Sequence, residues 1–297
     1  MKKLHTTTYK LYNKDNIRIS ILSDIHFSHK VKNKLDKLLK HLYNIKPNYI
    51  LIPGDLIDST DMIEERKEKE ILLNWIKELS KISKVIISLG NHDVYKIRKK
   101  RIIKNRFKYS FPLTFFNEIK SIGNVCLLNN EKYEDELIYI VGLTAPFSYY
   151  SKEESDILLN HLEKNKELIT NLPNNKLKIF LFHSPANLSK NKILEKIKEF
   201  NYFITGHMHN GCVPPIINEL WNSNKGIIAP SGKLFVPNER NTLRNKEDKL
   251  IVNGPVTTFQ SCSGIMQIFN GFYPIYNTIL EFDKDNINFI RKRKYHK

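Results

Sequence analysis

Apolar residues recur in the first third of the chain in two alternating patterns, which predict strands and helices in turn. Segments 17–23, 49–52 and 85–88 are short apolar runs with many β-branched residues, as expected for buried strands. Segment 32–44 carries four leucines at helical spacing, and 64–79 is the second predicted helix. Strand, helix and strand in succession indicate βαβ units that build a parallel sheet.

The alternation continues in the second half of the chain. Segments 125–129 and 137–143 are predicted to form the two strands of a hairpin. Segment 153–170 is expected to be a helix, because its leucines fall on one face. Segment 177–182 is another buried strand, and the apolar run 200–204 predicts a strand that ends in a tight loop.

Two segments interrupt this pattern within what we expect to be a single α/β domain over residues 1–297. Segment 95–117 is rich in Lys and Arg and then in Phe and Tyr. It is either a solvated helix whose aromatic residues enter the core, or a basic aromatic cap that contacts an anionic substrate or a membrane surface. Segment 212–258 reads as a long irregular stretch, of the kind that is usually functional or partly disordered. Strands are expected to return at 259–269 and 278–291.

Composition changes this picture mainly through charge. The 297 residues include 48 Lys and Arg against 31 Asp and Glu, which gives a formal net charge of +17 at pH 7. Either the lysines cover a solvated face, or the chain meets a polyanion such as phosphate, nucleic acid or an anionic membrane. The cysteines Cys126, Cys212 and Cys262 are too few and too scattered for a disulfide framework, which suits a reducing compartment.

The N-terminus and the hydropathy pattern indicate a cellular location. Residues 1–8 include two lysines but no apolar stretch, so they do not form a signal peptide. No apolar run approaches the roughly 20 residues that span a bilayer. We therefore expect a cytoplasmic protein, either free or peripheral at the inner membrane surface.

Polar residues of a few types follow the predicted strands, at the end of an open α/β sheet where ligands bind. In an extended segment, side chains two residues apart point to the same side, so Asp24 and His26 converge, as do His207 and His209. The full set is Asp24, His26, Asp55, Asn91, His92, His183, His207 and His209. Carboxylate, imidazole and amide ligands without cysteine suit Mn, Fe, Zn, Ni or Co rather than a structural thiolate zinc site.

These blocks resemble a known family. Asp-x-His, Gly-Asp, Gly-Asn-His-Asp, a single His and Gly-His-x-His occur in that order between residues 24 and 209, as in the calcineurin-like metallophosphoesterase superfamily, and most closely its small bacterial phosphohydrolases. The resemblance implies a two-sheet βαβ sandwich flanked by helices, with two divalent metal ions. One ion would be held by Asp24, His26 and His209. The other would be held by Asn91, His183 and His207, and Asp55 would bridge the two.

The resemblance also implies the chemistry. A hydroxide between the metals would attack phosphorus, since metal binding lowers the pKa of water from 15.7 to about 7. His92 would protonate the leaving oxygen or stabilise the transition state. Asp58 matches the family position that orients this histidine, and Asp93 is the other candidate for that role.

We therefore expect a phosphohydrolase that cleaves phosphoester or pyrophosphate bonds. One alternative is a DNA or RNA nuclease of the same superfamily, which is disfavoured because no aromatic and basic single-strand platform is recognisable. The other is a catalytically inactive binding scaffold, which is disfavoured because every ligand position is filled. Expected partners are a phosphorylated small-molecule or lipid-linked substrate and an anionic membrane surface. Nothing in the sequence assigns an oligomeric state.

Overall fold

The computed structural model describes residues 4–28, 31–98, 106–213, 226–227, 243–246, 249–256, 274–285 and 290–296. Within these residues, one large sheet has seven strands in the order β15-β1-β14-β2-β3-β4-β7. The strands are β1 Leu4–Tyr12, β2 Ile17–Ile21, β3 Tyr49–Pro53, β4 Lys84–Ser88, β7 Val125–Leu128, β14 Ile275–Asp283 and β15 Ile290–His296. Neighbours from β2 to β7 run parallel, whereas β14 pairs antiparallel with β2 and parallel with β1.

A second sheet has six strands in the order β12-β13-β11-β10-β9-β8. Its strands are β8 Glu131–Glu134, β9 Ile138–Leu143, β10 Leu177–Phe182, β11 Tyr202–Thr205, β12 Leu243–Lys246 and β13 Lys249–Asn253. The four inner strands are parallel, and β8 and β12 pair antiparallel at the two edges.

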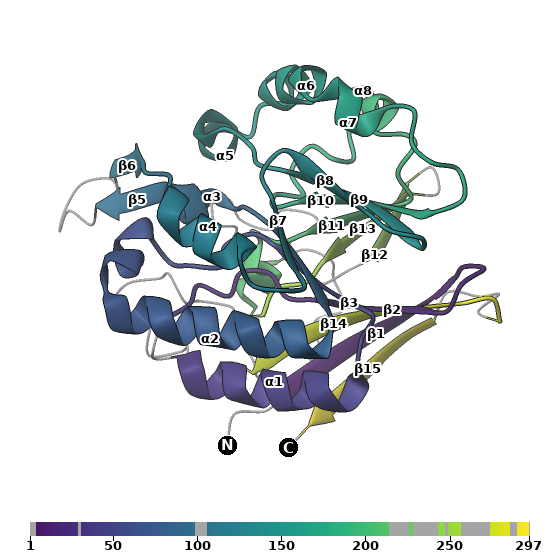
Figure 1. The fold of residues 1–297 in the computed structure, drawn as a ribbon. Coiled ribbons are helices and arrows are strands. Elements are labelled where there is room, and N and C mark those ends of the chain that lie inside the picture. The colour runs from purple at the N-terminus through teal and green to yellow at the C-terminus, as the bar shows by residue number, and fades with distance from the viewer. Residues whose placement is uncertain are drawn as a thin grey trace.

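Helices cover the outer faces of the two sheets (Figure 1). Helices α1 Lys32–Ile45, α2 Arg66–Ile82 and α4 Leu113–Lys120 lie over the first sheet. Helices α5 Phe147–Lys152, α6 Ser155–Lys164, α7 Lys166–Ile169 and α8 Asn191–Lys196 lie over the second. The remaining described helical elements are short turns, η2 Thr60–Glu64, α3 Asn91–Val94 and η3 His209–Cys212. None of the helices in the described part of the chain is long and apolar enough to cross a membrane.

Strand β3 is almost continuously apolar because both of its faces are buried. Ile50 and Ile52 pack into the cluster that joins the first sheet to α1 and α2. Leu51, between them, faces the second sheet and packs into the cluster that contains Ile179 and Leu181. Since a parallel strand buried on both faces alternates between two apolar layers, neither face carries polar residues. The predicted two-sheet α/β sandwich is therefore confirmed, with the middle core between the sheets.

Several predictions about single elements are wrong. Segments 125–129 and 137–143 do not form a hairpin, because β7 joins the first sheet and β9 joins the second. Strand β8 lies between them in sequence and pairs with β9. The helix predicted at 153–170 divides at Asn165 into α6 and α7.

A further error concerns the described residues 243–246 and 249–253 of segment 212–258, which is predicted to be irregular. It contains β12 and β13, and β13 extends the second sheet beside β11. The predicted strand 259–269 lies outside the described residues. The strand predicted at 278–291 is found as two, β14 and β15, separated by a turn at residues 284–285 and by residues outside the description.

Segment 95–117 begins with a hairpin rather than a solvated helix. Strands β5 Tyr95–Arg98 and β6 Arg106–Tyr109 pair antiparallel, and α4 follows them. The aromatic residues divide between two environments, because Phe115 and Phe116 are buried in the core whereas Tyr109 is 62% exposed. Contact of this segment with an anionic surface stays a prediction.

Candidate metal centre

The predicted ligand residues lie in loops at the carboxyl ends of strands from both sheets. Asp24 and His26 follow β2, Asp55 follows β3, and Asn91 begins α3 after β4. On the second sheet, His183 follows β10, and His207 and His209 follow β11. The two sheets meet here through a hydrogen bond of 2.8 Å from the backbone N–H of His207 to Oδ1 of Asp24. Residues that are far apart in the sequence thus share one location.

The backbone reaches this arrangement through left-handed turns. Five of the site residues have positive φ angles, namely Asp24 (52°), His26 (42°), Asp55 (53°), His207 (69°) and His209 (45°). The sequence-based expectation that Asp24 and His26 converge along an extended segment is therefore wrong, because β2 ends at Ile21. Left-handed residues other than glycine cost free energy, and they persist where function requires a particular side-chain direction.

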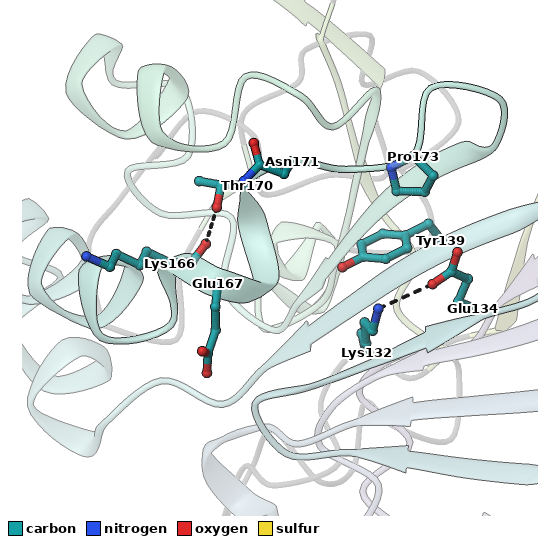
Figure 2. A pocket seen from close by; sticks show the side chains of 8 residues that line it. All are labelled: Lys132, Glu134, Tyr139, Lys166, Glu167, Thr170, Asn171 and Pro173. Carbon is teal, nitrogen blue, oxygen red and sulfur yellow. Dashed lines mark hydrogen bonds and ion pairs between the residues drawn. The ribbon is translucent and has the colours of Figure 1, made fainter.

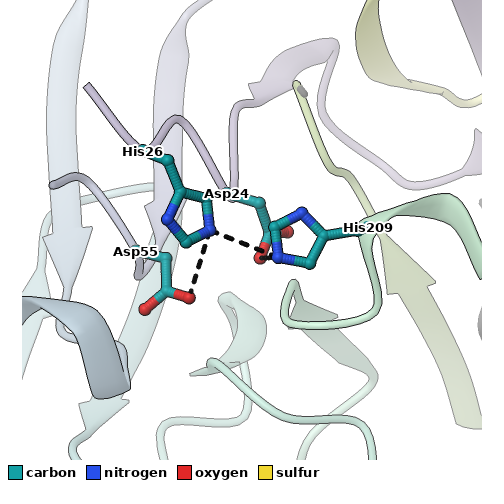
Figure 3. A group of neighbouring side chains, drawn as sticks. All are labelled: Asp24, His26, Asp55 and His209. Atoms are coloured by element: carbon teal, nitrogen blue, oxygen red, sulfur yellow. Dashed lines mark hydrogen bonds and ion pairs between the residues drawn. The ribbon is translucent and has the colours of Figure 1, made fainter. Parts of the chain in front are cut away.

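The first group of converging side chains consists of Asp24, His26, Asp55 and His209 (Figure 3). One ligand-type atom from each lies within 4.8 Å of the others. His26 Nε2 is 3.2 Å from His209 Nε2 and 3.5 Å from Asp55 Oδ2. Two imidazole nitrogens and a carboxylate oxygen that face one point form a suitable donor set for a divalent cation.

The second group consists of Asp55, His183 and His207. His183 Nε2 is 3.0 Å from Asp55 Oδ2, yet neither atom makes a hydrogen bond within the described part of the chain. Asp55 Oδ2 therefore faces both groups, while its other oxygen, Oδ1, accepts a hydrogen bond of 2.9 Å from the backbone N–H of His92. This geometry places Asp55 between the two groups.

A backbone carbonyl and a carboxylate next to the rings of His183 and His26 determine which imidazole nitrogen faces the candidate metal centre. His183 Nδ1 lies 2.7 Å from the backbone carbonyl of Pro53, which can only accept, so Nδ1 carries a proton and Nε2 is the nitrogen that presents a lone pair when the ring is neutral. His26 Nδ1 lies 3.4 Å from Asp58 Oδ1, which leaves Nε2 of His26 directed at Asp55 and His209. Carboxylates and carbonyls commonly orient metal-binding histidines in this way.

His92 lies beside the first group, with its ring centroid 4.6 Å from that of His26. Its Nδ1 donates to the backbone carbonyl of Asp58 at 2.6 Å, so Asp58 contacts His92 through its main chain. Asp93, the other sequence candidate, instead accepts backbone hydrogen bonds from Gly90 (2.8 Å) and Ile57 (3.1 Å). Asp93 thus joins two loops, and Asp58 is the residue that touches the His92 ring.

Burial and charge shift the protonation of the site. Asp24 and Asp55 are buried, with exposed fractions of 0% and 1%. Although burial raises the pKa of Asp55, the neighbouring His183, His92 and His26 lower it well below its usual value. Burial lowers the pKa of His183, but the charge of Asp55 outweighs this effect and raises it to about 9. Burial lowers the pKa of His209 to about 4, so this imidazole is neutral at neutral pH.

Several buried polar atoms at the site lack a hydrogen-bond partner among the described residues, and their chemistry shows whether the site fits a cation. Asp55 Oδ2, Asn91 Oδ1 and His183 Nε2 are buried and make no hydrogen bond with any described residue. Each can act as an electron-pair donor, and leaving such atoms unpaired in the interior costs free energy. Divalent cations would satisfy all three atoms, so the residues present fit a metal centre.

Two glycines allow the loops to approach this closely. Gly54 has a φ of 91°, and a Cβ atom there would lie 2.6 Å from the backbone nitrogen of Gly90. A Cβ atom at Gly90 would lie 2.5 Å from the backbone nitrogen of Asp55. Because both contacts are shorter than any real Cβ contact, a larger residue at either position would push Asp55 out of place.

Sequence reasoning missed two side chains at the site. Ser23 donates a hydrogen bond of 2.5 Å to Asp24 Oδ2. Tyr150, on α5, places its ring 5.9 Å from that of His183 and 5.5 Å from that of His207, measured between centroids. Burial and the charge of Asp55 raise the pKa of Tyr150, so its hydroxyl keeps its proton. Ser23 adjoins a predicted ligand, whereas no periodicity or motif marks Tyr150.

A surface cavity of about 650 Å³ lies elsewhere on the molecule and shares no residue with this centre (Figure 2). It is lined by Lys132, Glu134, Tyr139, Lys166, Glu167, Thr170, Asn171 and Pro173. Its charges partly pair with one another, since Lys132 Nζ is 3.3 Å from Glu134 Oε2. The chemically distinctive cluster of the described residues is therefore the one at the strand ends.

Comparison with known proteins identifies relatives of the chain. It is 23% identical over 255 residues to an uncharacterized metallophosphoesterase of Campylobacter jejuni, a match that covers 76% of this chain and 58% of that protein. It is 27% identical over 242 residues to an uncharacterized protein of Acanthamoeba polyphaga mimivirus, covering 76% of this chain and 16% of that protein. The chain thus spans only part of the length of both relatives.

Among solved structures, this chain is similar to the GAP50 anchor of the inner membrane complex of Plasmodium. The TM-score is 0.48 and the sequence identity is 11%, over 81% of this chain and 71% of that one. The model of the calcineurin-like phosphoesterase family matches residues 17–211, which include every residue of both ligand groups. The match therefore rests on the segment that builds the site. The chain belongs to the calcineurin-like phosphoesterase family, whose members bind divalent metals.

Proposed function

We propose that this protein is a dinuclear metal-dependent phosphohydrolase. Asp24, His26 and His209 would hold one divalent cation, and Asn91, His183 and His207 the other. The single observation that carries the proposal is the position of Asp55 Oδ2, which faces His26 Nε2 at 3.5 Å and His183 Nε2 at 3.0 Å. A carboxylate oxygen shared by two imidazole groups is suited to bridge two cations.

The chain's own residues would bind and orient the substrate around this pair. When bound, the cations supply Lewis acidity toward phosphoryl oxygens and a hydroxide nucleophile at neutral pH. His92 holds its Nδ1 against the Asp58 carbonyl, so Nε2 is the nitrogen free to exchange a proton with the leaving oxygen. The buried loops around Asp24 and Asp55 exclude bulk water, which strengthens each electrostatic contact.

The substrate class follows from the donor set and not from a shaped pocket. Carboxylate and imidazole ligands with an adjacent histidine suit transfer of a phosphoryl group from an ester or a pyrophosphate to water. A phosphorylated small molecule and a lipid-linked phosphate both fit this chemistry. The competing proposal, an inactive scaffold of the same fold, is disfavoured because both donor groups are complete.

The test uses the full chain, freed of metal by a chelator and reloaded separately with Mn, Fe, Co, Ni or Zn. Elemental analysis measures the metal stoichiometry, and hydrolysis of p-nitrophenyl phosphate and of its bis ester measures activity. We expect two ions per chain and turnover of at least one ester. Two bound ions without turnover of either ester, by a folded protein, would favour the scaffold.

Asp55→Asn provides the matched variant for this experiment. It should lose bound metal and turnover together, because the amide removes the shared charged oxygen that lies between the two groups. Asp156→Asn, at an exposed position on α6, is the control and should change neither. Retention of both ions by Asp55→Asn would contradict the bridging role.

A further inference from the structure

Tyr150 packs against the second ligand group, Asp55, His183 and His207, but is not one of its members. It lies in the short helix α5, and its ring packs beside the rings of both His183 and His207. Its exposed fraction of 8% is close to the 7% of His207 and the 9% of Asn91. The side chain is therefore buried to about the same extent as these two candidate ligands.

The hydroxyl of Tyr150 is a buried donor with no hydrogen-bond partner among the described residues. Buried tyrosine hydroxyls normally find a partner, because leaving one unpaired costs free energy. The neighbouring Tyr149 follows this rule, since its hydroxyl donates to the backbone carbonyl of Ala186. Two adjacent tyrosines on one helix thus differ in whether the folded chain satisfies their hydroxyl groups.

The unpaired groups of this region are of two opposite kinds. Asp55 Oδ2 and Asn91 Oδ1 have electron pairs to share, and a cation satisfies them. The Tyr150 hydroxyl has a proton to donate, and a cation does not satisfy it. An anion bound to the cation would satisfy such a donor, and under the proposed function that anion would be a phosphoryl group.

We propose that the Tyr150 hydroxyl donates a hydrogen bond to an oxygen of the phosphoryl group bound at the candidate metal centre. Tyr150 would then be a substrate-binding residue, contributed by a helix outside the strand-end loops that carry the other site residues. The inference rests on the proposed function, since the phosphoryl group is held there by the metals.

Tyr150→Phe tests this role, because it removes the hydroxyl and keeps the ring. Tyr149→Phe is the matched control, since it removes a neighbouring hydroxyl that already has a partner. Three quantities are measured on the full chain: metal stoichiometry, affinity of the metal-loaded protein for inorganic phosphate by calorimetry, and the denaturant midpoint of the metal-free protein.

We expect Tyr150→Phe to keep both ions and to bind phosphate about tenfold or more weakly, the usual effect of losing a hydrogen bond to a charged group. Its denaturant midpoint without metal should be unchanged or higher, because no folded-state bond is lost. Tyr149→Phe should show the reverse, with a lower midpoint and an unchanged phosphate affinity.

Equal phosphate affinities of Tyr150→Phe and the unmodified protein would overturn this inference alone. A lower midpoint of metal-free Tyr150→Phe would also overturn it, since the hydroxyl would then have a structural partner. Failure of the unmodified protein to bind metal or phosphate would instead overturn the proposed function, and this inference with it.

Discussion

At the scale of single residues, main-chain carbonyls decide how two histidines of the site are oriented. The Nδ1 atoms of His183 and His92 lie 2.7 Å from the Pro53 carbonyl and 2.6 Å from the Asp58 carbonyl. A carbonyl can only accept a hydrogen bond, so both rings carry a proton on Nδ1, and Nε2 is the nitrogen left to bind a metal or to exchange a proton. The difference between them is position: Nε2 of His183 faces Asp55, whereas His92 stands beside the group.

His92→Ala should separate catalysis from metal binding. The variant should keep both ions, because His92 belongs to neither predicted ligand group, and turnover should fall by about 10²–10⁴-fold, as for loss of a general acid. The fall should be smallest for esters with acidic leaving groups, which need least protonation. Rates over a series of substituted phenyl phosphates measure this, and an equal loss across the series would argue against proton donation by His92.

The affinity for metal should depend on pH through His183. Its pKa is raised to about 9 because Asp55 outweighs the effect of burial, and a protonated imidazole cannot bind a cation. Below about pH 9 the cation that binds His183 must displace this proton, so the affinity for that cation should rise about tenfold per pH unit and level off above that value. Calorimetry in two buffers of different ionisation enthalpy counts the protons released. His183→Asn should release one proton fewer, and an unchanged count would contradict the assignment.

At the scale of elements, Asp135 ties the β8–β9 hairpin to the first sheet. Its carboxylate accepts hydrogen bonds from the hydroxyls of Tyr49 on β3 and Tyr133 on β8, each at 2.8 Å. It also accepts from the backbone N–H groups of Leu137 (2.9 Å) and Ile138 (3.0 Å), which close the turn. One side chain therefore fixes both a hairpin and the contact between two sheets.

Asp135→Asn should lower the free energy of unfolding by about 1–3 kcal/mol, because the amide nitrogen that replaces one carboxylate oxygen cannot accept the hydrogen bonds made to that oxygen. Burial raises the pKa of Asp135, but the hydrogen bonds to the carboxylate outweigh it and lower the pKa. The stabilisation is therefore present above the pKa of the unfolded chain and is lost as the pH falls through the lower folded value. Urea unfolding at neutral and acidic pH tests this, with exposed Glu136→Gln as the control. Equal stability of Asp135→Asn and the control at neutral pH would refute it.

At the scale of the whole molecule, the net charge is +17, and part of the positive charge is concentrated in the β5–β6 hairpin, which follows Asn91 and His92 in the sequence. The register of β5 and β6 sets Lys96 opposite Lys108 and Arg98 opposite Arg106. Each of these four positions carries a positive charge in the sequence, and cations gathered in one hairpin attract an anionic surface. Two exposed side chains with apolar surface lie at the end of this hairpin, Tyr109 as the last residue of β6 and Leu113 at the start of α4. We propose that this edge of the molecule meets an anionic membrane surface.

Neutralising the hairpin should weaken binding to anionic vesicles and leave binding to neutral vesicles unchanged. The variant replaces four residues with glutamine: Lys96, Arg98, Arg106 and Lys108. Each cation near such a surface contributes about 1 kcal/mol, so the partition coefficient should fall by roughly two to three orders of magnitude at low salt. Vesicle sedimentation measures it, with exposed Lys190→Gln and Lys192→Gln as the control. Unchanged binding would leave a solvated face as the explanation of these charges.

The sequence by itself determined some of the local elements and the identity of the candidate metal ligands. Helical leucine spacing located α1, and apolar runs located β3, β4 and β10. These elements can be located because a helix with one buried face, or a strand buried on both faces, has a pattern of apolar residues within a short segment of sequence. Asp24, His26, Asp55, Asn91, His183, His207 and His209 were found because they follow such runs. The family resemblance then assigned them to two ions, and their metal-binding roles stay a prediction.

Only the tertiary structure decided which strands share a sheet and which way the site residues face. Strand β1 pairs with β14 from the opposite end of the chain, and β7 and β9 separate into different sheets, because hydrogen bonds between distant segments leave no periodic trace. The left-handed turns at Asp24 and Asp55 depend on loop contacts across the sheet, including the close approach of Gly54 to Gly90. Tyr150 reaches the site through the packing of α5, which no local pattern specifies.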